Sequence, residues 1–226
     1  MPGSKLGKYL LYAAGEIVLV VIGILIALGI NNWNTRNRET EARQELGQEV
    51  LDIIARDLAE IDKTQEEIEQ FEKFYSLVLT PPPSISRDSM LLGAQMVASG
   101  ASLYDFNDQA LLATQQASYA RDSLSLTLRD IYRVYKSGQE TLQVRKDLIA
   151  DELVSHLNEL RATTDWFHLW MLDGTLTPMA EEYFISIPFK NRAAQLDLLY
   201  LDTYQYELFL HEERLKKYQA QLQRHL

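Results

Sequence analysis

Cysteine is absent from the 226 residues, and glycine and proline are scarce, at 10 and 6. Without cysteine the chain can form no disulfide, no thiolate nucleophile and no cysteine-ligated metal centre. The shortage of turn-forming residues argues against barrels and sandwiches. Basic residues are also few, at 22 against 32 acidic ones, which gives a net charge of −10. Because a nucleic-acid binder needs a basic surface, we expect no nucleic-acid partner.

Motifs that bind nucleotides or carry catalysis are missing as well. The sequence contains no Gly-x-x-x-x-Gly-Lys-Ser/Thr loop, no Gly-x-Gly-x-x-Gly turn and no Gly-x-Ser-x-Gly elbow. Two pairs of glutamate and histidine lie four residues apart, at Glu152/His156 and Glu207/His211. Facing inward, such pairs would ligate a metal inside a helical bundle. They are frequent on ordinary acidic helices, so we expect solvated faces and predict a non-enzymatic protein without a cofactor.

The N-terminal part of the chain is one long apolar run. Residues 9–30 contain a single charge, Glu16. As a helix these 22 residues would extend about 33 Å, enough for a hydrocarbon core of about 30 Å. We therefore predict a transmembrane helix at 9–31, preceded by a short cytoplasmic tail at 1–8. A buried helix of a soluble protein and a cleaved signal peptide are the alternatives.

Aromatic residues flank this run. Tyr9 and Tyr12 lie near its start, and Trp33 follows its end. Tyrosine and tryptophan concentrate at membrane–water interfaces, so we expect these three residues at the two membrane surfaces. Basic residues on the two sides nearly balance, and charge alone therefore determines the orientation only weakly.

The same run carries a specific pattern from Lys8 to Asn34. It includes the string GEIVLVVIGILIAL, one further residue, and the ending INNWN. This pattern resembles a bacterial family of single-span membrane proteins of unknown function. The resemblance covers about 27 residues and implies a short cytoplasmic N-terminus, one span and a helical extracytoplasmic domain, but no known activity. Gly29 departs from the pattern, which has glutamine there.

A stripe on this helix carries its small residues and its only charge. Spacings of three and four place on one face Ala13, Glu16, Val20, Gly23 and Ala27. Small residues let helices approach closely in lipid, so we expect self-association along this stripe. An acid in a membrane is costly, and three interpretations of Glu16 stay open. In the first, Glu16 is an interfacial acid that is protonated or paired with a nearby lysine. In the second, its side chain forms a hydrogen bond across an oligomer. In the third, it handles protons in a pore.

The remaining chain, 32–226, is predicted to form an antiparallel helical bundle, so the fold class is all-α. Apolar residues recur at helical spacing in three long stretches, about 35–79, 122–161 and 188–226. A proline run beginning at Pro81 ends the first stretch. Asp122 and Ser186 are expected to cap the other two helices. A short helix is expected around residues 89–98, followed by a loop at 100–108 and a helix through Ser118. Gly138, inside the second long helix, indicates a packing contact or a kink.

Two further features of the bundle are its aromatic connection and its charge runs. The connection at 163–187 is rich in aromatic residues, namely Trp166, Phe167, Trp170, Tyr183 and Phe184. These rings either cap the bundle core or form a patch for a partner or ligand. Charge runs at 66–69 and 212–217 are expected to be solvated.

Together these features predict a non-enzymatic protein anchored in the bacterial inner membrane, with its N-terminus in the cytoplasm and the bundle outside. Its expected role is assembly, scaffolding or ligand and partner sensing, as a homo-oligomer joined by the span and the membrane-proximal helix. Expected partners are membrane lipid, a second copy and a protein bound at the bundle. The alternative is an ion or proton channel that uses Glu16.

Overall fold

The computed structural model describes residues 3–115 and 122–226, with side chains from Ala14 onward, and this part of the chain is helical without a strand. The predicted all-α class is confirmed. The helices are α1 (Gly3–Leu79), α2 (Arg87–Ser99), α3 (Gln109–Gln115), α4 (Ser123–Thr163), α5 (Phe167–Asp173), α6 (Pro178–Phe184), α7 (Ile187–Asp197), the π-helix η1 (Leu198–Tyr204) and α8 (Gln205–Gln223).

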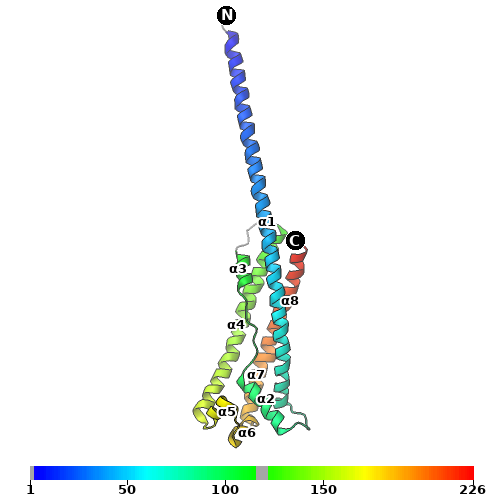
Figure 1. Cartoon of the computed structure of the whole chain (residues 1–226), viewed down its shortest axis with the longest axis vertical. Coiled ribbons are helices and arrows are strands. Elements are labelled where there is room, and N and C mark those ends of the chain that lie inside the picture. The colour runs from blue at the N-terminus through cyan, green and yellow to red at the C-terminus, as the bar shows by residue number, and fades with distance from the viewer. Residues whose placement is uncertain (1–2, 116–121) are drawn as a thin grey trace.

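Helix α1 is one unbroken helix of 77 residues, about 115 Å long. Its first part projects alone, and its second part lies in the bundle (Figure 1). The predicted span and the first predicted bundle helix are therefore continuous. The predicted tail at 1–8 is helical from Gly3 onward, and Met1 and Pro2 lie outside the described residues. The helix ends at Leu79 because the following proline run cannot continue it.

The bundle has four sides, one of which is not a continuous helix. Helices α1 and α4 run away from the projecting end, and α7, η1 and α8 return toward it (Figure 1). The remaining side consists of α2, an extended segment and α3, which pack against α1 and α4. We call the extended segment at residues 100–108 the strap. Neighbouring sides are antiparallel, as predicted, and the strap falls where a loop was expected.

Hydroxyl and carboxylate caps fix where several helices begin. The Asp122 carboxylate accepts a hydrogen bond from the Ser125 amide at 2.8 Å, and the Ser186 hydroxyl accepts one from the Phe189 amide. Both were predicted. The helix expected to run through Ser118 extends to Gln115 in the described part of the chain, and Ser118 lies outside it.

The third long helical stretch contains the π-helix η1, which the sequence pattern did not indicate. It turns Tyr200 and Tyr204 toward the strap. The Tyr200 hydroxyl accepts a hydrogen bond from the Ser102 amide at 3.0 Å and donates one to the Ser102 carbonyl at 2.8 Å. The Tyr204 hydroxyl accepts a hydrogen bond from the Tyr104 amide at 2.6 Å. Side chains thus satisfy main-chain groups that a helix would have paired internally.

A close approach between α4 and α8 occurs at Gly138. A Cβ atom there would collide with the imidazole of His211. Helix α4 therefore needs glycine at this point, which confirms the predicted packing contact. Nearby, the buried Tyr135 hydroxyl donates a hydrogen bond to the Asp57 carboxylate at 2.6 Å and joins α4 to α1.

Candidate functional site

The apolar start of α1 is a candidate membrane span. It is the one described helix that is long and apolar enough to cross a membrane. None of its apolar side chains is buried, and Leu19 is 74% exposed. A core helix of a soluble protein would bury such side chains, so that alternative does not fit this structure.

The predicted assembly stripe lies on the surface of this span. Glu16, Val20, Gly23 and Ala27 are exposed, and a Cβ at Gly23 would meet no atom within 4 Å. The side chains of the other predicted stripe residue, Ala13, and of the predicted interface residues Tyr9 and Tyr12 lie outside the described part. The third interface residue, Trp33, is 65% exposed, just beyond the apolar run.

A polar stalk separates the span from the bundle. We define the stalk as residues 31–42 of α1, all of which are exposed. It carries local contacts, including the Thr40 hydroxyl donating to the Arg36 carbonyl at 2.9 Å. Below it, Arg43 forms an ion pair of 3.4 Å with Asp122 at the start of α4. The stalk has no apolar stripe, so it offers no hydrophobic seam to a second copy.

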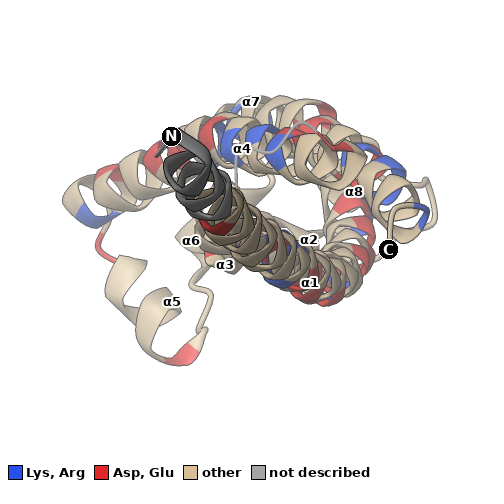
Figure 2. Cartoon of the chain, turned by 90° about the horizontal axis from the view of Figure 1, so that it is seen from above, with Lys and Arg blue, Asp and Glu red and all other residues tan. Residues whose placement is uncertain are grey.

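The aromatic connection caps the far end of the bundle. Trp166, Trp170 and Phe184 are buried, and Phe167 and Tyr183 are half-buried. The Phe184 ring centroid lies 5.1 Å from that of Trp170. These rings come from α5, α6 and the turn before α5, and Figure 2 shows α5 standing to one side of the bundle. The burial of three of the five rings favours the predicted cap of the core, and the partner or ligand patch stays a prediction.

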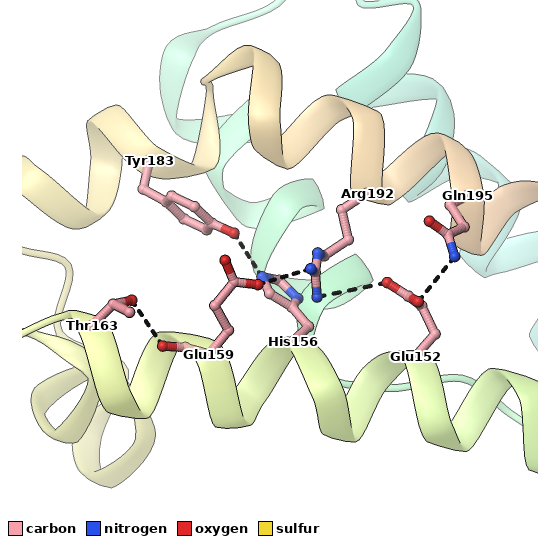
Figure 3. A network of polar contacts seen from close by, with 7 residues as sticks. All are labelled: Glu152, His156, Glu159, Thr163, Tyr183, Arg192 and Gln195. Atoms are coloured by element: carbon pink, nitrogen blue, oxygen red, sulfur yellow. Dashed lines mark hydrogen bonds and ion pairs between the residues drawn. The ribbon is translucent and has the colours of Figure 1, made fainter.

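The first Glu-x-x-x-His pair belongs to a polar network between α4 and α7 (Figure 3). His156 is fully buried, and its Nε2 atom lies 2.8 Å from the Tyr183 hydroxyl. Burial lowers the His156 pKa to about 4, and the Arg192 charge adds to this shift. Arg192 lies between two acids, 3.6 Å from Glu152 and 2.8 Å from Glu159. The expectation of a solvated face is therefore wrong for this pair, because its members join α4 to α6 and α7.

The second pair is also not solvated. His211 is 1% exposed, and its ring nitrogens have no hydrogen-bond partner in the described part of the chain. Burial lowers its pKa to about 4, with a further contribution from Arg214. Glu207 lies 3.9 Å from Arg145 on α4. Both histidines are thus neutral near pH 7 and shielded from solvent, which suits packing rather than proton transfer.

Two further expectations can be compared with the structure. Within the described ranges no three histidine, aspartate or glutamate residues are grouped so that they could hold a metal, and the metal alternative gains no support. Among the charge runs expected to be solvated, Glu212 is an exception at 3% exposure. It accepts a hydrogen bond of 2.6 Å from Gln65 and pairs with Lys216, so it joins α8 to α1.

Comparisons with known proteins add one finding. Neither the curated proteins nor the solved structures give a match to the chain. A family model does match, over residues 16–76, which cover most of the span, the stalk and nearly all of α1 within the bundle. The matched segment is therefore similar to a family of unknown function (DUF6090), as the pattern of the apolar run predicted.

Proposed function

We propose that this protein is a non-enzymatic anchor and scaffold of the bacterial inner membrane, with its N-terminus in the cytoplasm and its bundle outside. The continuity of α1 carries the proposal. One helix forms the candidate span, the stalk and one side of the bundle, so the bundle is held at a set distance from the bilayer. The stalk alone contributes about 18 Å of that distance.

The bundle is fixed to α1 close to the stalk. Arg43 pairs with Asp122, and the C-terminal Leu226 packs so tightly on α1 that a Cβ at Gly47 would lie 2.8 Å from it. A rigid attachment of this kind suits a protein that presents a binding surface. Self-association belongs to the span in this proposal, because the stalk lacks an apolar stripe.

The native mass of the full chain in nanodiscs tests the assembly. We expect a defined oligomer for the unaltered protein and dissociation for Gly23→Leu, because the larger side chain keeps the helices apart on the stripe. The matched control is Gly29→Leu, which makes the same change away from the stripe at another glycine with open space around it. A monomer in all three samples, or equal dissociation of both variants, would contradict assembly through this face.

A second proposal is a channel, and the single charge of the apolar run favours it. Glu16 lies on the same face as Gly23, so an oligomer would bring several carboxylates together. Under this proposal, planar bilayers conduct with the unaltered protein and lose most of the current or its cation selectivity with Glu16→Gln. Silent bilayers at verified protein load, or equal currents from both proteins, would reject the channel.

A further inference from the structure

A groove runs along the bundle between α1 and the π-helix. It consists of two adjoining hollows of about 310 and 380 Å³, which share Leu201, Asp202 and Gln205. The π-helix shapes this wall, because Leu201 and Asp202 belong to η1 and Gln205 follows it directly. Helices α1 and η1 are far apart in the chain, so no local pattern in the sequence indicates this groove.

The groove has three acids without a cationic partner. Glu72, Asp197 and Asp202 line the smaller hollow, and none of them forms an ion pair with a basic side chain of the described residues. Burial raises the pKa of Asp197, and the charges of Asp202 and Glu72 raise it further. Mutual repulsion of these carboxylates costs free energy that a bound cation would relieve.

A largely buried tyrosine also lines the smaller hollow. Tyr75 is 2% exposed and contributes to the lining. Buried tyrosine hydroxyls usually find a hydrogen-bond partner, as those of Tyr135, Tyr200 and Tyr204 do here. The Tyr75 hydroxyl has no such bond among the described residues, but it is not sealed from solvent as the unpartnered Tyr104 hydroxyl is, so it stays open toward the hollow that Tyr75 lines. A donor group seated beside the carboxylates would satisfy it.

The arrangement of these groups favours an extended ligand over a metal ion. The acids do not form a cluster of the kind that holds a metal, as far as the described residues go. The larger hollow is lined by Tyr206 and Phe209, which are 58% and 48% exposed, together with Leu201. Aromatic faces attract cations, and apolar walls suit a methylene chain. We propose that this groove binds an elongated organic cation, an aliphatic diamine or polyamine whose ammonium groups meet the carboxylates of Glu72, Asp197 and Asp202.

Calorimetric titration of spermidine into the full chain in detergent, at constant ionic strength, tests the proposal. We expect saturable binding with one spermidine per chain. Replacing both aspartates, Asp197→Asn with Asp202→Asn, weakens binding about tenfold or more, because two charge-assisted contacts are lost. The control is Asp151→Asn with Asp165→Asn, which removes the same charge from exposed positions outside the groove and changes affinity less than about twofold.

Tyr75→Phe gives a test without any change in charge. We expect affinity to fall about threefold while the melting temperature of the unliganded protein stays the same, because the hydroxyl has no partner to lose. If the control variant at Asp151 and Asp165 weakened spermidine binding as much as the variant at Asp197 and Asp202, the binding would reflect general charge attraction, and the proposal would be overturned. Non-saturable binding, displacement by magnesium at equal ionic strength, or tighter binding of a lysine-rich peptide than of spermidine would overturn it too.

Discussion

Acidification from pH 6.5 to pH 4 is expected to lower the free energy of unfolding by roughly 5 kcal/mol. His156 and His211 are buried with pKa values near 4, against 6.5 for an ordinary histidine. Well above pH 6.5 both are neutral in the folded and the unfolded chain, so these two groups no longer change stability with pH. Between pH 6.5 and pH 4 the unfolded chain takes up protons that the folded chain refuses, and the two histidines together cost roughly 5 kcal/mol by pH 4. Because typical domains are stable by about 5–15 kcal/mol, this loss is large enough to unfold the bundle.

Protonation of Asp57 changes the free energy of unfolding in the opposite direction. Burial raises its pKa, and the hydrogen bond from Tyr135 offsets only part of that shift. As the pH falls through its raised pKa, the folded chain binds this proton first, which adds stability and subtracts from the effect of the histidines. Asp57→Asn removes this opposing contribution and is expected to steepen the acid loss.

Denaturant unfolding of the full chain in detergent at several pH values measures this dependence. His156→Gln and His211→Gln are each expected to remove about half of the slope between pH 6.5 and 4. The control is His225→Gln, since His225 is exposed near the end of the chain. A stability that stays flat across this interval would mean that the two imidazoles are charged in the folded state, contrary to their burial.

Phe184→Ala is expected to lower the free energy of unfolding by about 3–5 kcal/mol. The Phe184 side chain is 1% exposed, and its ring lies 5.1 Å from Trp170 and 5.2 Å from Phe189 between centroids. Alanine would leave a cavity that these large rings cannot close. The same unfolding assay at pH 7 measures the loss.

The matched control for Phe184→Ala is Leu172→Ala. Leu172 lies in α5 at the same end of the bundle but is 84% exposed, so its truncation is expected to change stability by less than about 0.5 kcal/mol. A loss below about 1 kcal/mol for Phe184→Ala would show that the ring is dispensable for the core, and would return it to the candidates for a partner surface.

The long helices could be predicted because each buries a stripe of apolar residues along its whole length. Ile54, Ile61 and Ile68 repeat on α1 and are buried, and a heptad spacing of this kind is visible in the sequence alone. The caps at Asp122 and Ser186 were equally visible, since a short polar side chain before an apolar stretch has a local effect.

The π-helix and the burial of the histidines could not be predicted, because they depend on contacts between residues far apart in the chain. Nothing in residues 198–204 distinguishes a π-helix from an α-helix, and its consequence, two tyrosines bonded to the strap, involves residues about 100 positions apart. The burial of His211 depends on Gly138, because the absence of a side chain there leaves room for the His211 imidazole of α8. A Glu-x-x-x-His pair has the same appearance on a solvated and on a buried helix face, so the prediction of solvation had no local signal to correct it.

In the proposed membrane anchor, the unbroken α1 joins the bundle rigidly to the candidate span, so any tilt of the span also tilts the bundle. From Trp33 to Leu79 the helix extends about 69 Å. Membrane helices tilt by about 20° on average, and a rod of this length tilted so far carries its outer end about 24 Å sideways. Because α1 has no break between the candidate span and Leu79, the tilt would be transmitted along its whole length. Packing between neighbouring spans and the anchoring of interfacial residues such as Trp33, which set the tilt of a membrane helix, would thereby also set the position of the outer end of the bundle.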